Sequence, residues 1–299
     1  MNLCDLRNLN QGGVDCDYEL LVPDFINFSQ KSAAEIKESD ANSLLAFLQR
    51  KAYDANPMKR LYPVRGEIKR ITDQSTEPTD GSLDKGYSKQ LLPGRAIYQF
   101  EWPSSVCSDR NIIKFNRYSG GAFIINSNRL LIGLRNANGN MSPLNVDVSV
   151  WGGGFSGSGG DLQTIKMRVD FGNQIRLLSN VMAYKFREQE DIETLTGMRD
   201  VEIVVVSKTT GMVIVKAVTG CDYVNLFGML TKDDDTDILS TTEGWLVNGS
   251  EPAAVQENES DQTYTITLDG GTFENISIAS TDTLVKNSIL GFEGVITYF

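Results

Sequence analysis

Beyond Pro57 the apolar residues of this sequence alternate with polar residues in many short segments. Alternation with a period of two places every second side chain on the same face of a β-strand. Residues typical of turns separate the segments, as in Pro78-Thr79-Asp80-Gly81 and Ser119-Gly120-Gly121. The sequence therefore predicts an all-β fold built from many short strands, either a sandwich or a barrel.

The predicted strands fall into two groups, before and after residue 197. The first group is 61–64, 67–71, 96–102, 112–115, 122–125, 130–134, 146–151, 165–169, 175–178 and 182–186. The second group is 201–206, 212–218, 223–230, 244–247, 264–268, 273–278 and 294–299. The first two runs of the second group are rich in β-branched residues and are joined by a short turn, which is typical of a hairpin.

One strong helix signal precedes these strands. Its apolar residues recur at helical spacing: Leu44, Leu45, Phe47, Leu48 and Ala52. Ser39 or Asp40 can cap its start, and Asn56-Pro57 ends it. A helix with one apolar face is suited to cover an open sheet, so we expect a mainly β fold with one flanking helix.

These patterns predict three parts of the chain. Residues 1–38 form an N-terminal arm with little periodicity, and residues 39–197 form a β-sandwich body with one helix. Residues 198–299 form an acidic, immunoglobulin-like β-domain of about the usual size for that class.

Charge is distributed unevenly along the chain. The 28 Lys and Arg and 39 Asp and Glu residues give a formal net charge of −11. Residues 221–299 hold 2 basic and 14 acidic residues, so all the net acidity lies in the last quarter. Because phosphate binding requires a concentrated basic surface, the composition disfavours nonspecific binding of nucleic acid.

The sequence contains no histidine, which excludes several kinds of catalytic site. The chain alone cannot build a Ser-His-Asp or Cys-His nucleophile, or an HExxH zinc site. We therefore predict that the protein is not an enzyme and holds no cofactor and no metal ion.

Three other motifs are each interpreted as structural. Gly152, Gly154 and Gly157 match GxGxxG, but the following residues alternate like a strand and do not open a helix. The loop 233–237 has four aspartates that can bind calcium, but a solvated acidic loop is favoured because the pattern lacks the EF-hand glycine and distal glutamate. Glu188, Glu190 and Asp191 offer carboxylate pairs for glycoside hydrolysis, and surface charge is again favoured.

The four cysteines, Cys4, Cys16, Cys107 and Cys221, show no CxxC spacing. They are interpreted as buried or incidental thiols, with a Cys4–Cys16 bridge left open. Asp5 and Arg7 stand where a signal peptide needs apolar residues, and no stretch approaches the length of a membrane span. We therefore expect synthesis in the cytoplasm and no membrane segment.

Two apolar-tipped segments are predicted to contact other subunits. The arm ends in an apolar patch that includes Phe25 and Phe28, and the glycine-rich loop 151–160 carries Trp151 and Phe155. We expect residues 1–28 and this loop to become ordered when subunits meet.

Five aromatic residues allow a different interpretation, a platform that binds sugars: Phe100, Trp102, Phe115, Tyr118 and Phe123. In a β-sandwich of this size such residues are more often part of the core. The core interpretation is favoured, and a carbohydrate-binding adhesin stays open as an alternative.

Residues 40–135 resemble virion structural proteins of tailed bacteriophages, in particular tail-tube-type subunits. The resemblance lies in LLAFLQRKAYDANPMKRLYPV, GEIKRITDQSTEPTDGSLDKGY, IYQFEW and GGAFIINSNRLLIG. It implies a β-sandwich body with a flanking helix, extended arms or loops that contact neighbours, and often an appended immunoglobulin-like domain. It implies no catalytic residues.

Together these observations predict a structural subunit that assembles into rings or a tube in a phage tail or head–tail region. Its partners are then copies of itself and other virion proteins, its location is the virion, and an acidic wall lets DNA pass without sticking. The alternatives are a connector, a head decoration protein, the adhesin named above, or a glycosidase that uses Glu188 or Glu190.

Overall fold

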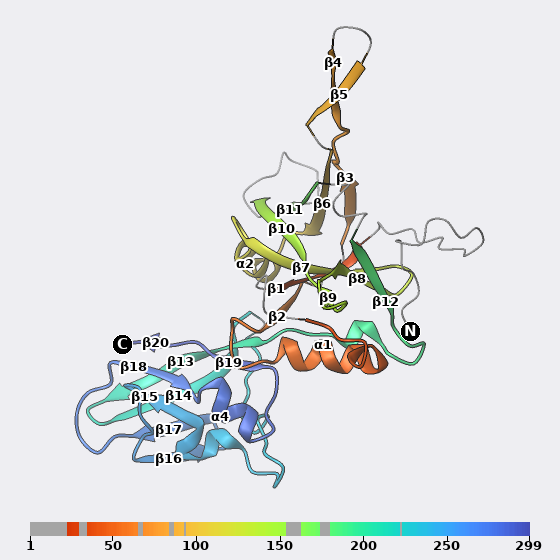
Figure 1. Ribbon diagram of the computed structural model, residues 1–299. Helices are drawn as coiled ribbons and strands as arrows, with labels where there is room; N and C mark the ends of the chain where they lie inside the picture. Colours follow the sequence, from red (N-terminus) through yellow and green to blue (C-terminus); the bar gives the residue numbers. More distant parts are fainter. Residues whose placement is uncertain are drawn as a thin grey trace. The chain divides into compact units, whose positions relative to one another are not determined.

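The computed structural model describes residues 23–29, 35–64, 68–83, 87–92, 94–153, 163–173, 180–221 and 223–299. The chain divides into two compact units, Met1–Gly197 and Met198–Phe299, called unit 1 and unit 2 below (Figure 1). Both are built mainly from β-strands, which confirms the predicted fold class. Among the described residues, no helix is long and apolar enough to cross a membrane.

Unit 1 is built around one large sheet with the strand order β12-β8-β7-β10-β11-β6-β3, to which β1 and β2 attach at β7 and β9 attaches at β8. The strands are β1 (Pro23–Ser29), β2 (Leu61–Val64), β3 (Arg70–Asp73), β6 (Arg95–Pro103), β7 (Ser119–Asn126), β8 (Leu130–Arg135), β9 (Met141–Ser142), β10 (Leu144–Gly152), β11 (Thr164–Asn173) and β12 (Val181–Lys185). All described pairings within this sheet are antiparallel.

The sheet encloses the main core of unit 1. Val146, Val148 and Val150 of β10 are buried while the residues between them are exposed, as the period of two predicts. Phe28 of β1 and Phe100 of β6 belong to the same buried cluster, although their strands are far apart in the strand order. Because one face of the sheet supplies both, the sheet curls around this core.

A second core lies on the opposite face, under the predicted helix. Helix α1 (Leu44–Ala52) follows the short 3-10 helix η2 (Asp40–Ser43) and buries Leu44, Phe47 and Leu48. These side chains pack with Phe123 and Leu131 from β7 and β8. Helix α1 therefore covers the sheet as expected.

Other local predictions for unit 1 differ from the structure. The predicted strand 112–115 is wrong, because helix α2 (Val106–Ile113) and a turn occupy this segment. The break expected at Pro78 to Gly81 is instead the start of a hairpin of β4 (Thr79–Leu83) and β5 (Tyr87–Leu92). Part of the predicted arm, Pro23–Ser29, is strand β1, and the predicted strand 175–178 lies outside the described residues. The short helix η3 (Ile192–Thr194) precedes the end of the unit.

Unit 2 has two sheets around one core. The larger sheet has the order β16-β17-β14-β13-β19, and the smaller has the order β15-β18-β20. The elements are β13 (Arg199–Thr209), β14 (Met212–Thr219), η4 (Ile238–Ser240), η5 (Thr242–Gly244), β15 (Trp245–Val247), β16 (Ala254–Asn258), β17 (Thr263–Thr267), β18 (Asn275–Ile278), α4 (Thr281–Lys286), β19 (Phe292–Gly294) and β20 (Thr297–Tyr298). Trp245, Tyr264 and Ile276 are buried in the shared core. The immunoglobulin-like class of this unit stays a prediction.

Two further differences concern unit 2 and the cysteines. The predicted strand 223–230 is wrong, because the segment forms turns that bury Leu226 and Leu230. Cys107 and Cys221 are disulfide-bonded, so the interpretation of these two as thiols is also wrong, since spacing alone does not reveal pairing. Cys4 and Cys16 lie outside the described residues.

Candidate functional site

Three of the four predicted subunit contacts lie among the described residues, and they differ in exposure. Phe28 is completely buried in the core of unit 1, and Phe25 is half-buried against the residues under α1. Phe28 therefore has no surface to offer a neighbour in this fold. Trp151, at the end of β10, is 43% exposed, and Phe155 lies outside the described residues.

Trp151 lies on the face of the sheet that points away from the main core of unit 1. The register places Trp151 opposite Lys166 of β11, Lys166 opposite Glu101 of β6, and Glu101 opposite Arg70 of β3. A second row runs beside it through Ser149, Arg168, Gln99 and Thr72. These eight residues are called the open face below.

Hydrogen bonds organise the centre of the open face. Glu101 is 9% exposed, accepts a hydrogen bond from Gln99 Nε2 at 2.8 Å, and lies 3.4 Å from Lys166 Nζ. Gln74 Nε2 in turn donates to Gln99 Oε1 at 2.6 Å. This chain of polar contacts satisfies the centre of the face from within unit 1.

The margins of the open face differ from its centre. Arg70 and Arg168 are exposed, and their side chains form no hydrogen bond or ion pair with any residue that the structure describes. Tryptophan and arginine are the residues that most often dominate binding at protein interfaces. The open face thus combines a fixed polar centre with three side chains suited to hold a partner.

Strands β3 and β6 continue into the β4–β5 hairpin as one two-stranded ribbon (Figure 1). The pairs Asp73↔Tyr98, Thr76↔Arg95 and Thr79↔Leu92 follow a single register, which shifts only after Thr79. At about 3.3 Å per residue, the part of the ribbon beyond Thr76 extends up to about 23 Å. Beyond the Thr76–Arg95 pair it has no third strand among the described residues.

A pocket of about 370 Å³ lies in unit 1 where β10 and β11 separate. Their last pair is Asp147↔Asp170, after which β11 makes a bulge at Phe171 and β10 continues beside β7. Gly172 has a φ of +79°, and its N–H donates to Asp170 Oδ1 at 2.9 Å. Bulges of this kind redirect side chains and are frequent beside binding sites.

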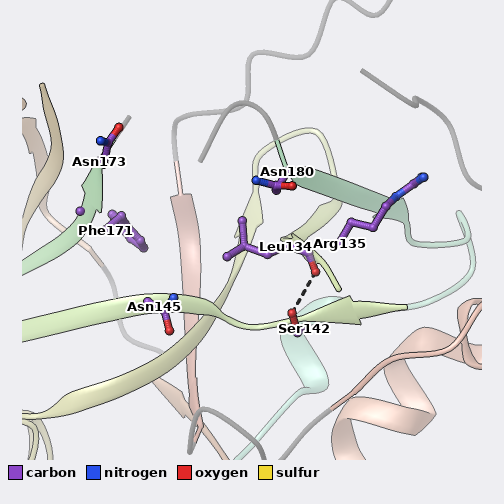
Figure 2. A pocket seen from close by; sticks show the side chains of 8 residues that line it. Leu134, Arg135, Ser142, Asn145, Phe171, Asn173 and Asn180 are labelled. Atoms are coloured by element: carbon purple, nitrogen blue, oxygen red, sulfur yellow. Dashed lines mark hydrogen bonds between the residues drawn. The ribbon is translucent and has the colours of Figure 1, made fainter. Parts of the chain in front are cut away.

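The pocket is lined by five polar side chains together with Leu134, Phe171 and the backbone of Gly172 (Figure 2). The polar residues are Arg135, Ser142, Asn145, Asn173 and Asn180. Ser142 Oγ donates to the carbonyl of Leu134 at 3.1 Å, and Phe171 packs edge-on against Tyr98 at a centroid distance of 6.2 Å. Burial raises the pKa of Tyr98.

Strand β13 of unit 2 has an edge that is paired over only part of its length. Its parallel partner β19 covers Arg199 to Val201, and Thr297 Oγ1 reaches the carbonyl of Ile203 at 3.4 Å. Val204 and Val206 are exposed along the strand beyond this point, and a bulge lies between Val205 and Ser207. Open edges pair readily with other strands, although a bulge shortens the length available.

The acidic loop of unit 2 uses its carboxylates internally. Asp237 accepts hydrogen bonds from Tyr264 Oη at 2.5 Å, from Gly228 N at 3.0 Å and from Leu239 N at 3.1 Å. Hydrogen bonds from Thr236 hold the pKa of Asp234 below its usual range. Among the described residues no group of three or more His, Cys, Asp or Glu side chains is placed to bind a metal ion.

The carboxylates considered for glycoside hydrolysis also have structural contacts. Glu190 accepts from Leu45 N at 3.0 Å, in the first turn of α1, and from Arg187 N at 2.8 Å. Asp191 accepts from Glu193 N at 3.0 Å and caps η3. These contacts explain both residues without a reaction.

The aromatic residues considered as a sugar platform are mostly in the core, as favoured above. Phe100, Trp102 and Phe123 are buried, and Phe115 and Tyr118 are half-buried against Phe28. The polar pocket was not predicted, because its residues come together only where two strands separate.

Comparison with known proteins adds no relative. No protein-family model matches the chain, and neither the curated proteins nor the solved structures contain a significant match.

Proposed function

We propose that this chain is a structural subunit of a tailed-bacteriophage virion that assembles with copies of itself into rings or a tube, in the tail or the head–tail region. The β4–β5 ribbon is the observation that carries the proposal. A two-stranded ribbon in water is marginally stable, because it has no core to bury. A ribbon of this length therefore calls for a neighbouring surface.

Two further features support assembly. On the open face, the side chains of Trp151, Arg70 and Arg168 have no hydrogen bond or ion pair among the described residues, and β13 has an edge that is open over part of its length. The virion setting and the immunoglobulin-like class of unit 2 rest on the sequence resemblance described above.

The proposal assigns the chain no catalytic step, and its chemistry is association. Unit 2 holds 5 basic and 16 acidic residues, whereas unit 1 holds 23 of each. Contacts through unit 1 therefore meet little net repulsion, while acidic units repel DNA that passes them.

A shortened ribbon tests the proposal. Replacing residues 77–94 by Asn-Gly joins Thr76 to Arg95 through a two-residue hairpin turn and keeps the two backbone hydrogen bonds between them. We expect wild-type rings or tubes by negative-stain electron microscopy and larger species by sedimentation as concentration rises. The shortened chain should stay monomeric with the same thermal unfolding.

Each outcome of this comparison is informative. If the shortened chain still forms rings, the ribbon is not the element through which the copies assemble. A wild-type chain that is monomeric at every concentration would overturn the proposal of self-assembly.

A further inference from the structure

The pocket beside the β11 bulge has an unusual set of hydrogen-bonding groups. Three asparagine amides and one serine hydroxyl line it, with one guanidinium and no carboxylate. An amide group both donates and accepts hydrogen bonds, and so does a hydroxyl. The lining is therefore matched to a ligand whose own groups both donate and accept.

This composition disfavours other ligand classes. A hard metal ion needs several oxygen ligands that include carboxylates, and the lining has none. A polyphosphate needs more positive charge than the single guanidinium of Arg135 provides. A purely apolar ligand would leave the amide of Asn145 without a hydrogen-bond partner, which costs binding free energy.

We propose that this pocket binds a carbohydrate, with one sugar ring seated between β10 and β11. The side chain of Asn145 forms no hydrogen bond with another described residue, so its amide is available to two sugar hydroxyls. Ser142 donates to Leu134 and can still accept a hydrogen bond. Leu134 and Phe171 supply the apolar side chains of the lining, against which the C–H face of the ring can pack (Figure 2).

Because all eight lining residues belong to unit 1, this inference does not depend on the proposed assembly. Arg135 lies at the end of β8 beside Asn180, whose carbonyl accepts from its backbone N–H at 2.8 Å. A guanidinium at the rim can bind a ring hydroxyl, or a carboxylate where the sugar carries one.

The test uses the full chain. Saturation-transfer NMR measures the binding of glucose, galactose, N-acetylglucosamine and glucuronate. Calorimetry measures the binding of inorganic phosphate in a separate experiment. We expect at least one sugar to bind saturably with a dissociation constant on the order of 1 mM. Asn145→Ala should weaken that sugar about five- to tenfold, because one or two neutral hydrogen bonds are lost.

Asn111→Ala is the matched control, because it makes the same substitution at an exposed asparagine of α2 that does not line the pocket. It should bind the sugar as the wild type does, and thermal unfolding should show that both variants are folded. Asn145→Asp, which keeps the shape and loses the amide donor, should weaken binding as well. The inference is overturned if no sugar binds saturably, if Asn145→Ala binds equally well, or if phosphate alone binds.

Discussion

At the scale of single residues, the best-defined polar contact of unit 2 joins Tyr264 and Asp237. Both residues are buried, and the phenol hydroxyl donates to the carboxylate at 2.5 Å. Burial and the neighbouring Asp237 carboxylate raise the pKa of Tyr264 well above its ordinary value. The pair fixes the acidic loop to strand β17.

Tyr264→Phe removes this hydrogen bond and should lower the free energy of unfolding by about 2 kcal/mol at pH 7. Because the pKa of Tyr264 is raised in the folded protein, its neutral phenol stabilises the fold at pH values below about 10, the pKa of tyrosine in the unfolded chain. This stabilisation is lost as the pH rises above 10. The difference in the free energy of unfolding between the wild type and Tyr264→Phe should therefore become smaller by about 1 kcal/mol between pH 9 and pH 11. Urea unfolding at each pH measures it.

Tyr298→Phe is the control for this prediction, because Tyr298 is 75% exposed and its hydroxyl has no partner among the described residues. It should match the wild type at each pH. A constant difference between wild type and Tyr264→Phe across this range would contradict the assignment of the alkaline effect to Tyr264.

Substitution of Phe28 should mainly lower stability, whereas substitution of Trp151 should mainly weaken assembly. Phe28→Ala opens a cavity in the main core of unit 1 and should cost about 3 to 5 kcal/mol of stability. Trp151→Ala removes a ring that is already 43% exposed, so it should cost clearly less stability than Phe28→Ala while assembly weakens. Thermal unfolding and sedimentation of both variants measure the two effects.

A Trp151→Ala chain that assembles like the wild type would exclude the open face as a subunit contact. A Phe28→Ala chain of unchanged stability would contradict its place in the core.

At the scale of elements, helix α1 depends on a residue from another part of the chain. Glu190 accepts a hydrogen bond from Leu45 N in the first turn, where Ser43, the residue before the helix, makes no capping hydrogen bond with its side chain. A carboxylate at this end also interacts favourably with the helix dipole. Glu190 therefore supplies a cap that the local sequence lacks.

Glu190→Ala should lower the free energy of unfolding by about 1 kcal/mol, the usual cost of losing a helix cap. Chemical denaturation followed by far-ultraviolet circular dichroism measures it. Glu188→Ala is the matched control and should have little effect, because Glu188 is exposed and has no partner among the described residues. Equal losses in the two variants would exclude the capping role.

An element could be predicted from the sequence where the residue pattern that defines it lies within one segment of the chain. The alternation in β10 and the helical spacing of Leu44 to Ala52 each depend on residues within one segment, and both elements formed as expected. The segment 112–115 was wrongly predicted because its apolar residues extend a helix that begins at Val106. The β11 bulge, and with it the pocket, depends on pairings between distant strands, which no local pattern encodes.

At the scale of the whole molecule, charge should control assembly. Association brings together acidic units that each carry 5 basic and 16 acidic residues. Raising the salt concentration from about 10 to 150 mM shortens the screening length from about 30 to 8 Å and weakens this repulsion. Sedimentation should therefore show larger species at the higher salt concentration. Assemblies that dissociate instead would mean that attraction between opposite charges holds the copies together.

The single register of the ribbon also limits how its length can change. Neighbouring side chains point to opposite faces, so one extra residue on each strand turns the tip over, and two restore it. The shift after Thr79 is different, because it adds one residue to β5 and none to β4. The ribbon can therefore lengthen without changing its outward face only if each strand gains an even number of residues, about 7 Å for every two residues. An odd number would present a different surface to the same neighbour.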